Sequence, residues 1–218
     1  MKKFGTPKGS SGLGDTLLLN AVCKNLSELK TIQLRPAQKH FSILFDKISD
    51  IEITETVNVL PDTGNGHYTL TKLRNFFSKP ENLDIRPVVL HSDEESEAWA
   101  ANMLSKIKKP AVIFQPNCSA PWQHIRSMPP LLHQKILVEI SDRYSIINMS
   151  SDEFKGLDLS KYISLLRKCG RYIGCNTGDM HLAISVGCIC DIYEPDVCLE
   201  FDPKKWRYNH PTIKYKKF

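Results

Sequence analysis

The sequence predicts an α/β fold with mostly parallel sheets, arranged in two lobes of about 100 residues each. Short apolar segments alternate with helical patterns along most of the chain, which is typical of parallel β-α-β units. Residues 111–115 form a continuous apolar run, as expected of a strand buried on both faces. Residues 106–110 are lysine-rich and end in proline, so we expect a hinge there between lobes 1–108 and 109–218.

The first lobe is expected to contain five strands and four helices. A capping-box pattern at 92–95 opens the last of these helices, which runs to about residue 107. The expected strands are residues 3–6, 31–34, 51–53, 57–60 and 88–90, and the other helices are 15–29, 36–47 and 70–77.

The second lobe is expected to contain four strands and three helices. The strand at 188–193 should close its sheet, and residues 201–218 then form an aromatic and basic tail. The other expected strands are 111–115, 145–149 and 172–175, and the helices are 131–142, 158–168 and 180–186.

Composition narrows the class of protein. The 218 residues are 41% hydrophobic and 24% charged, as in a globular domain, and no apolar run approaches the roughly 18 residues of a membrane span. The start of the chain lacks the apolar core of a signal peptide. Seven cysteines scattered without a disulfide framework indicate a reducing cytoplasm, and the missing CxxC pair argues against a zinc site. We expect neither a metal nor a cofactor.

The net charge of +5 is concentrated near the C-terminus. Aromatic residues lie among these cations, and such interleaving suits a nucleic-acid partner or an anionic substrate. A solvated basic tail, or a tail packed across a domain joint, explains it equally well. The residues concerned are Lys204, Lys205, Trp206, Arg207, Tyr208, Lys214, Tyr215, Lys216, Lys217 and Phe218.

A Gly/Ser loop at residues 7–15 precedes the first helix. It lacks the Gly-Lys-Ser/Thr end of a phosphate P-loop, and Leu17 stands where a dinucleotide loop needs its last glycine. Asp15 therefore has two interpretations. It either caps the helix, or presents a carboxylate to a cleft beside a close glycine approach.

A second polar turn, at residues 176–179, lies between a strand and a helix. Free backbone N–H groups and the helix dipole make such a place suited to a phosphate or another anion. His181, in the first helical turn, adds a possible donor to a phosphate oxygen. An ordinary capped helix with a surface histidine fits the pattern equally well.

The segment NTGDMHLA at residues 176–183 resembles the D-S/T-G-x-x-H-x-A signature of the heptosyltransferase-like glycosyltransferases of family nine. Thr177, Gly178, His181 and Ala183 match, whereas Asn176 replaces the family's aspartate. Residues 12–26, GLGDTLLLNAVCKNL, are similar to the G-x-G-D opening of that family. Residues 126–129 keep the cation and the proline of its Lys/Arg-x-W-P motif, with methionine in place of tryptophan.

The resemblance implies a GT-B fold, in which two Rossmann-like lobes face each other across a cleft. It implies an inverting, metal-independent transfer of a sugar from a nucleotide diphospho-sugar to an acceptor hydroxyl. The first lobe would bind the acceptor, with Asp15 as general base, and the second lobe the donor. The donor-binding residues would be Gly12, Gly14, Arg126, Ser150, Asn176, Thr177, Gly178 and His181.

Two acceptors stay open at this point. A lipopolysaccharide-type saccharide is the family norm, while the small, basic chain suits a hydroxymethylated base in DNA, as in phage DNA glycosyltransferases. A base in DNA would have to leave the stack to react. A nucleotide-binding module without catalysis is the alternative, because Asn176 removes a carboxylate. We expect a monomer.

Overall fold

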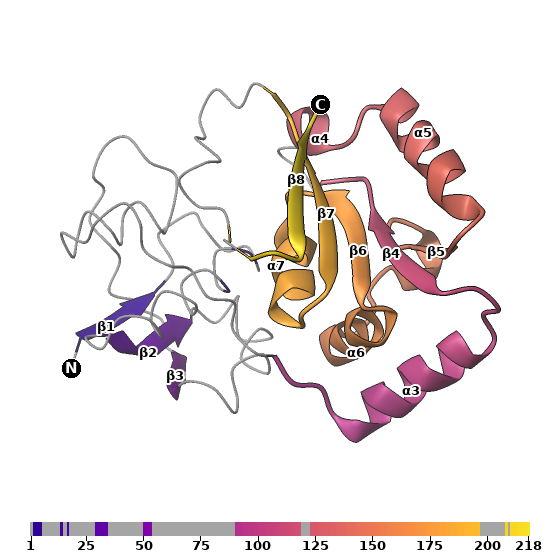
Figure 1. Cartoon of the computed structure of the whole chain (residues 1–218). Coiled ribbons are helices and arrows are strands. Elements are labelled where there is room, and N and C mark those ends of the chain that lie inside the picture. Colours follow the sequence, from indigo (N-terminus) through magenta and orange to yellow (C-terminus); the bar gives the residue numbers. More distant parts are fainter. Residues whose placement is uncertain are drawn as a thin grey trace. The chain divides into compact units, whose positions relative to one another are not determined.

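The computed structural model of the chain describes residues 2–5, 14, 17, 29–34, 50–53, 90–118, 123–196, 208 and 210–218. The chain divides into two compact units. The first contains residues 1–90 and 198–210, and the second contains residues 91–197 and 211–218. Both units contain a parallel sheet, so the predicted α/β class is confirmed (Figure 1).

The first unit contains a three-stranded parallel sheet in the order β1-β2-β3. Its strands are β1 (Lys2–Gly5), β2 (Leu29–Leu34) and β3 (Asp50–Ile53), close to three of the predicted segments. Gly14 and Leu17 are helical and Leu17 is buried, in line with the predicted first helix. The helices predicted at 36–47 and 70–77 and the strand predicted at 57–60 lie outside the described residues.

The second unit is built on a five-stranded parallel sheet in the order β5-β4-β6-β7-β8. Because β5 pairs with one edge of β4 and β6 with the other, the winding direction reverses between β4 and β6. The strands are β4 (Ala111–Gln115), β5 (Ser145–Asn148), β6 (Arg171–Cys175), β7 (Ile189–Glu194) and β8 (Ile213–Lys217).

The outer strand β8 corrects one prediction, because the strand at 188–193 does not close the sheet. Part of the predicted basic tail pairs in parallel with β7, so that Tyr215 lies opposite Ile192. The lysine-rich sequence of β8 hid its strand character. Charged residues on an edge strand also oppose pairing with other chains, which fits its place at the sheet edge.

Helices cover both faces of this sheet. On one face Val112, Phe114 and Ile173 pack with Ile136 and Ile140 of α5 (Pro130–Ser141). On the other face α6 (Leu159–Cys169) and α7 (Gly178–Ser185) pack against β6, and α3 (Glu94–Ser105) lies outside α6 (Figure 1). Two short elements, α4 (Gln123–Arg126) and the 3₁₀ turn η2 (Asp152–Phe154), complete the unit. Each large apolar side chain buried here contributes about 1.5–3 kcal/mol.

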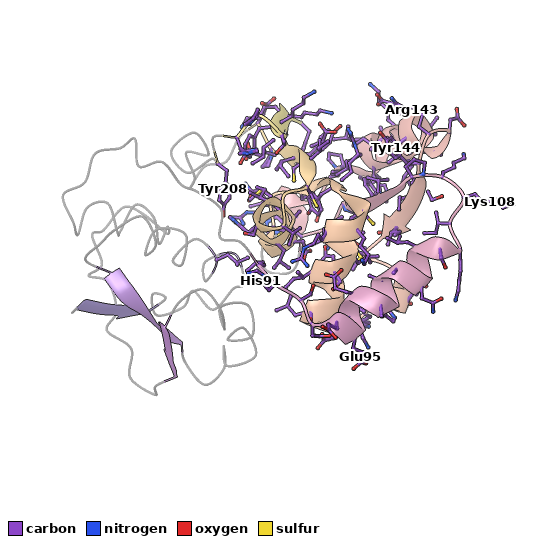
Figure 2. The ribbon with its side chains drawn as sticks, turned by 60° about the horizontal axis from the view of Figure 1, so that its bottom comes forward. His91, Glu95, Lys108, Arg143, Tyr144 and Tyr208 are labelled. Carbon is purple, nitrogen blue, oxygen red and sulfur yellow. The ribbon has the colours of Figure 1, made fainter. Side chains whose placement is uncertain are left out.

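Helix α3 belongs with the second unit, so the division falls after Leu90 and not at the predicted hinge near residue 108. The reason is packing, because Ser96 and Ala100 of α3 are buried and α3 packs on α6. Figure 2 labels Glu95 near the start of this helix and Lys108 beyond its end. The lysines that suggested a hinge therefore only follow the last turn of α3.

Side chains at the start of α3 tie it to α6. Asp93, and not Ser92 of the predicted capping box, is the N-cap, and its carboxylate accepts from the Ser96 N–H at 2.7 Å. Partial burial raises the pKa of Glu97, but hydrogen bonds from Ser92 and Lys168 and the charges of Lys168 and Arg167 outweigh it and lower that pKa to about 2. Glu97 is therefore ionised in its 2.6 Å ion pair with Arg167.

Residue 174 in β6 must be glycine, because the backbone of β4 passes too close to leave room for a side chain. A Cβ atom at this position would stand 2.7 Å from the backbone oxygen of Gln115 and 2.5 Å from the Tyr172 hydroxyl. We expect Gly174→Ala to lower the free energy of unfolding by about 1–3 kcal/mol, because the backbone of β4 must move. Urea denaturation followed by circular dichroism measures this change. Ser145→Ala on β5 is the control, and equal stability of both variants would contradict the prediction.

Candidate functional site

Polar side chains gather where the parallel strands of the second unit end. Gln115 ends β4, Ser150 follows β5, residues 176–179 follow β6, and Glu194 ends β7. In open α/β sheets, ligands bind outside the carboxyl ends of the strands, at the point where the winding reverses. In this unit that point lies between β4 and β6, next to Gln115 and the turn at 176–179.

The turn after β6 has the predicted strand-turn-helix form. Thr177 occupies the N-cap position in an extended conformation, with φ −136° and ψ 179°, and its side chain makes no capping hydrogen bond. Helix α7 begins at Gly178, two residues before its predicted start. The backbone N–H groups of the first turn and the positive end of the dipole thus face the carboxyl edge of the sheet, as an anion site requires.

Asn176 is paired with a buried carboxylate from the neighbouring strand. Its Nδ2 atom donates to Oε1 of Glu194 at 3.1 Å, and only 8% of Asn176 and 2% of Glu194 are exposed. The ammonium group of Lys217 lies 3.9 Å from the other carboxylate oxygen. An aspartate at position 176 would put a second negative charge against Glu194. This contact gives a physical reason for asparagine here.

A chain of three polar side chains spans the ends of β5, β4 and β6. The Ser150 hydroxyl donates to Oε1 of Gln115 at 2.7 Å, and Nε2 of Gln115 donates to Oδ2 of Asp179 at 3.0 Å. Burial is the main influence on Asp179 and raises its pKa to about 6, although the Gln115 hydrogen bond acts in the opposite direction. A carboxyl that titrates this near neutrality is a candidate functional group.

His181 and Arg126 lie within electrostatic reach of each other. His181 is 5% exposed, and burial together with the charge of Arg126 lowers its pKa to about 3. The interpretation of His181 as a surface residue is therefore wrong. Its imidazole is neutral and keeps one N–H donor. Arg126 is the last residue of α4 and is half-buried, so part of it remains accessible to solvent.

The structure places some predicted site residues together and leaves others undescribed. Ser150, Arg126 and the segment 176–181 all belong to the second unit. Gly14 is helical and half-buried, whereas Gly12 and Asp15 lie outside the described residues. Their roles, like those of the donor-binding residues, stay predictions.

Sequence reasoning missed Asp179 and Gln115. Asp179 occupies a position that the resembling signature leaves free, and Gln115 was counted as the last residue of an apolar strand. A polar residue at the carboxyl end of a buried parallel strand was the available signal, because that edge is where such folds bind ligands.

Within the part of the chain that the structure describes, there is no group of three or more His, Cys, Asp or Glu residues placed to hold a metal ion. The five described cysteines are free, and Cys118, Cys175, Cys188 and Cys190 among them are buried. Among the described residues, no helix combines the length and hydrophobicity needed to cross a bilayer.

Solved structures with a similar fold are glycosyltransferases. The Escherichia coli ADP-heptose lipopolysaccharide heptosyltransferase II matches 99% of this chain over 90% of its own, with a TM-score of 0.61 and 12% identity. The family 9 glycosyltransferase of Veillonella parvula matches 100% over 86% of its own, with a TM-score of 0.60 and 11% identity. No protein-family model and no curated protein matches the sequence.

A third similar structure is the iron-containing dodecameric glycosyltransferase TibC of enterotoxigenic E. coli, which has also been solved with ADP-D-β-D-heptose. It matches 98% of this chain over 62% of its own, with a TM-score of 0.60 and 16% identity. The chain thus has the α/β fold of the heptosyltransferases and family 9 glycosyltransferases, as the resemblance implied. At these identities the likeness establishes the fold.

We expect Asp179→Asn to stabilise the folded protein above pH 6. The pKa of Asp179 is raised from 3.8 to about 6, so the folded state holds the extra proton between these values, and burial of the ionised carboxylate costs stability in full above them. The gain should be about 1–3 kcal/mol at pH 7.5 and close to zero at pH 4. Urea unfolding at both pH values measures it, with the exposed Asp196→Asn as control. A constant difference between the two pH values would contradict the prediction.

Proposed function

We propose that this protein is a glycosyltransferase that moves a sugar from a nucleotide diphospho-sugar to an acceptor hydroxyl. The observation that carries the proposal is the uncapped start of α7 at the sheet's switch point, with Arg126 and His181 beside it, in a chain with the fold of glycosyltransferases. One of these similar structures holds a nucleotide diphospho-sugar, ADP-D-β-D-heptose. This supports the same chemical class of donor here.

The second unit would hold the donor. Its diphosphate accepts hydrogen bonds from the backbone N–H groups at Thr177 and Gly178 and from the Arg126 guanidinium, whose planar donors match phosphate oxygens. His181 adds a neutral N–H donor, and Asn176 fixes the turn through Glu194. Ser150, which is exposed after β5, is the proposed contact for the nucleoside. Gly12 and Gly14 are proposed as further donor-binding residues, because residues 12–26 are similar to the opening of the family nine sequences.

The transfer would be a single displacement. Asp15 takes the proton of the acceptor hydroxyl, whose oxygen bonds to the anomeric carbon as the bond from that carbon to the diphosphate breaks. Attack from the face opposite the leaving group inverts the anomeric centre. Arg126 and the start of α7 stabilise the charge that develops on the diphosphate. In this proposal fixed protein charge does what a divalent cation does elsewhere, so the reaction proceeds without metal.

We propose a saccharide as the acceptor, as in the lipopolysaccharide heptosyltransferase of similar fold. The basic C-terminal stretch offers less free charge to DNA than its sequence suggests. Lys216 lies 3.3 Å from Asp191, and Lys217 is directed to Glu194 and to the Pro195 carbonyl. A hydroxymethylated base in DNA remains the second acceptor, favoured by the exposed Lys214 on β8.

Catalytic inactivity is the competing proposal, and Asn176 is what suggested it. In this structure Asn176 is buried against Glu194 and belongs to the scaffold of the turn. The proposed base is a different residue, Asp15, and so the loss of a carboxylate at 176 does not remove it. We propose that the protein acts as a monomer in the cytoplasm. The dodecameric TibC demonstrates that a glycosyltransferase of similar fold can assemble further.

The deciding experiment is a transfer screen read by mass. Nucleotide diphospho-sugars are incubated with saccharide acceptors and with DNA containing hydroxymethylated bases, each with and without EDTA. We expect a mass increase of one sugar on a saccharide, unaffected by EDTA. Asp15→Asn should transfer at least about 10²-fold more slowly, which is the scale of general-base removal. If product forms only on DNA, the acceptor is a DNA base and not a saccharide. If the protein binds the donor but transfers no sugar to any acceptor, it is a nucleotide-binding module without catalysis.

We expect Arg126→Ala to weaken binding of a nucleotide diphospho-sugar by roughly 1.5–3 kcal/mol, as for a lost hydrogen bond to a charged group. Isothermal titration calorimetry measures the change, and acceptor affinity should stay constant. Arg143→Ala is the matched control. That arginine follows α5, and its guanidinium carbon lies 5.9 Å from the centre of the Tyr144 ring; both residues are labelled in Figure 2. It precedes β5 and so lies at the amino end of that strand. Unchanged donor affinity in Arg126→Ala would place the diphosphate elsewhere.

A further inference from the structure

The proposed anion site contains a carboxylate of its own. Asp179 is the second residue of α7, directly after Gly178, so its side chain belongs to the helical turn whose N–H groups would hold the diphosphate. Gln115 holds the carboxylate by a 3.0 Å hydrogen bond across the switch point. A negative charge beside a diphosphate opposes binding, and a turn built only for phosphate would not carry one.

The groups around Asp179 do not neutralise it. The phenol of Tyr162 is buried, and its hydroxyl has no hydrogen-bond partner among the described residues. Within the described part of the chain, the recorded ion pairs do not include Asp179. The charge of Asp179 acts on the phenols of Tyr162 of α6 and Tyr172 of β6. Cys169, Cys175 and Cys188 act in turn on one or the other of these phenols, and the charge of Arg126 of α4 acts on His181 of α7.

Most of these neighbours are uncharged. Burial is the main cause that raises the pKa of Tyr162 and of Tyr172 well above the ordinary value, and the charge of Asp179 adds to it in both. Burial also raises the pKa of Cys175 and Cys188 to about 12. The described groups that interact with Asp179 itself are therefore two neutral phenols and the Gln115 amide, and such groups solvate a second negative charge poorly.

We propose that Asp179 couples donor binding to the uptake of one proton, so that the site takes a nucleotide diphospho-sugar with this carboxyl neutral and disfavours it when the carboxyl is ionised. The proposal rests on the proposed function, because it assumes that the α7 turn holds the diphosphate. The protonation state of Asp179 would then determine how tightly the site binds the negatively charged diphosphate. In its neutral form the carboxyl becomes a hydrogen-bond donor and can contribute to a phosphate oxygen.

The direction of the pH effect follows from linkage. In the free protein, burial raises the pKa of Asp179 to about 6, and a bound diphosphate raises it further by like-charge repulsion. Well below pH 6 the carboxyl is mostly neutral, so donor affinity approaches its highest value there. Above pH 6 each pH unit costs about tenfold in affinity, until the pKa of the bound form is passed.

The test is calorimetry with ADP-heptose and UDP-glucose as probes, from pH 5.5 to pH 8. The diphosphate of a nucleotide sugar is esterified at both ends and has no group that titrates in this range, unlike a free nucleoside diphosphate. For the wild type we expect an affinity about tenfold or more weaker at pH 8 than at pH 5.5. For Asp179→Asn we expect a nearly flat profile, and at pH 8 a tighter affinity than that of the wild type. Glu139→Gln on α5, at an exposed position, should follow the wild type.

Proton uptake gives a second readout that needs no variant. Titrations at pH 7 in buffers of different ionisation enthalpy report the protons taken up on binding. We expect a substantial fraction of one proton for the wild type and close to none for Asp179→Asn. Binding without proton uptake, equal pH profiles in both proteins, or weaker binding by Asp179→Asn at pH 8 would each overturn the inference alone. If neither probe binds either protein at any pH, the proposed function fails as well.

Discussion

The parallel pairing of β4 with β6 is the constraint on which the second unit depends. In the sequence these strands are separated by α4, α5, β5, η2 and α6. Their pairing creates the reversal of winding at which the polar groups meet. Gly174 lies opposite Gln115, and the absence of a side chain there leaves room for both the Gln115 backbone and the Tyr172 ring. Gln115 reaches from the end of β4 to α7, where its Nε2 atom donates to Asp179. A shift of either strand along the other would separate Gln115 at the end of β4 from Asp179 in the turn that follows β6.

Each buried ionisable group around the turn at 176–179 is accommodated in a different way. Glu194 is almost fully buried and is matched by the Asn176 amide and the Lys217 ammonium group. His181 avoids charge altogether, because burial and Arg126 both favour its neutral form. Burial raises the pKa of Asp179 to about 6, and the hydrogen bond from the Gln115 amide offsets only part of this effect. The turn thus combines one satisfied carboxylate with one that changes its charge near neutral pH.

The sequence was informative where local pattern and tertiary packing agree. Buried parallel strands such as residues 111–115 and helices with a wide apolar face, such as α6, were found within a few residues of their observed bounds. Strand β8 was missed because lysines on a sheet edge conceal the alternation of Ile213 and Tyr215. The place of α3 was missed because its contact with α6 joins segments that are far apart in sequence. Contacts between distant segments have no local signal.

The same limit explains why the site was recognised only in part. The turn at 176–181 carries a local pattern, but the partners of its side chains, Gln115 and Glu194, come from other strands. Compared with the resembling signature, the carboxylate at the first position is absent and one is present three residues later. Glu194 already occupies the β7 side of the turn, so a carboxylate at 176 would meet like charge there. On the β4 side Nε2 of Gln115 donates a hydrogen bond to the carboxylate of Asp179. In this chain the turn therefore carries its carboxylate at position 179, on the side of β4 and in the first turn of α7.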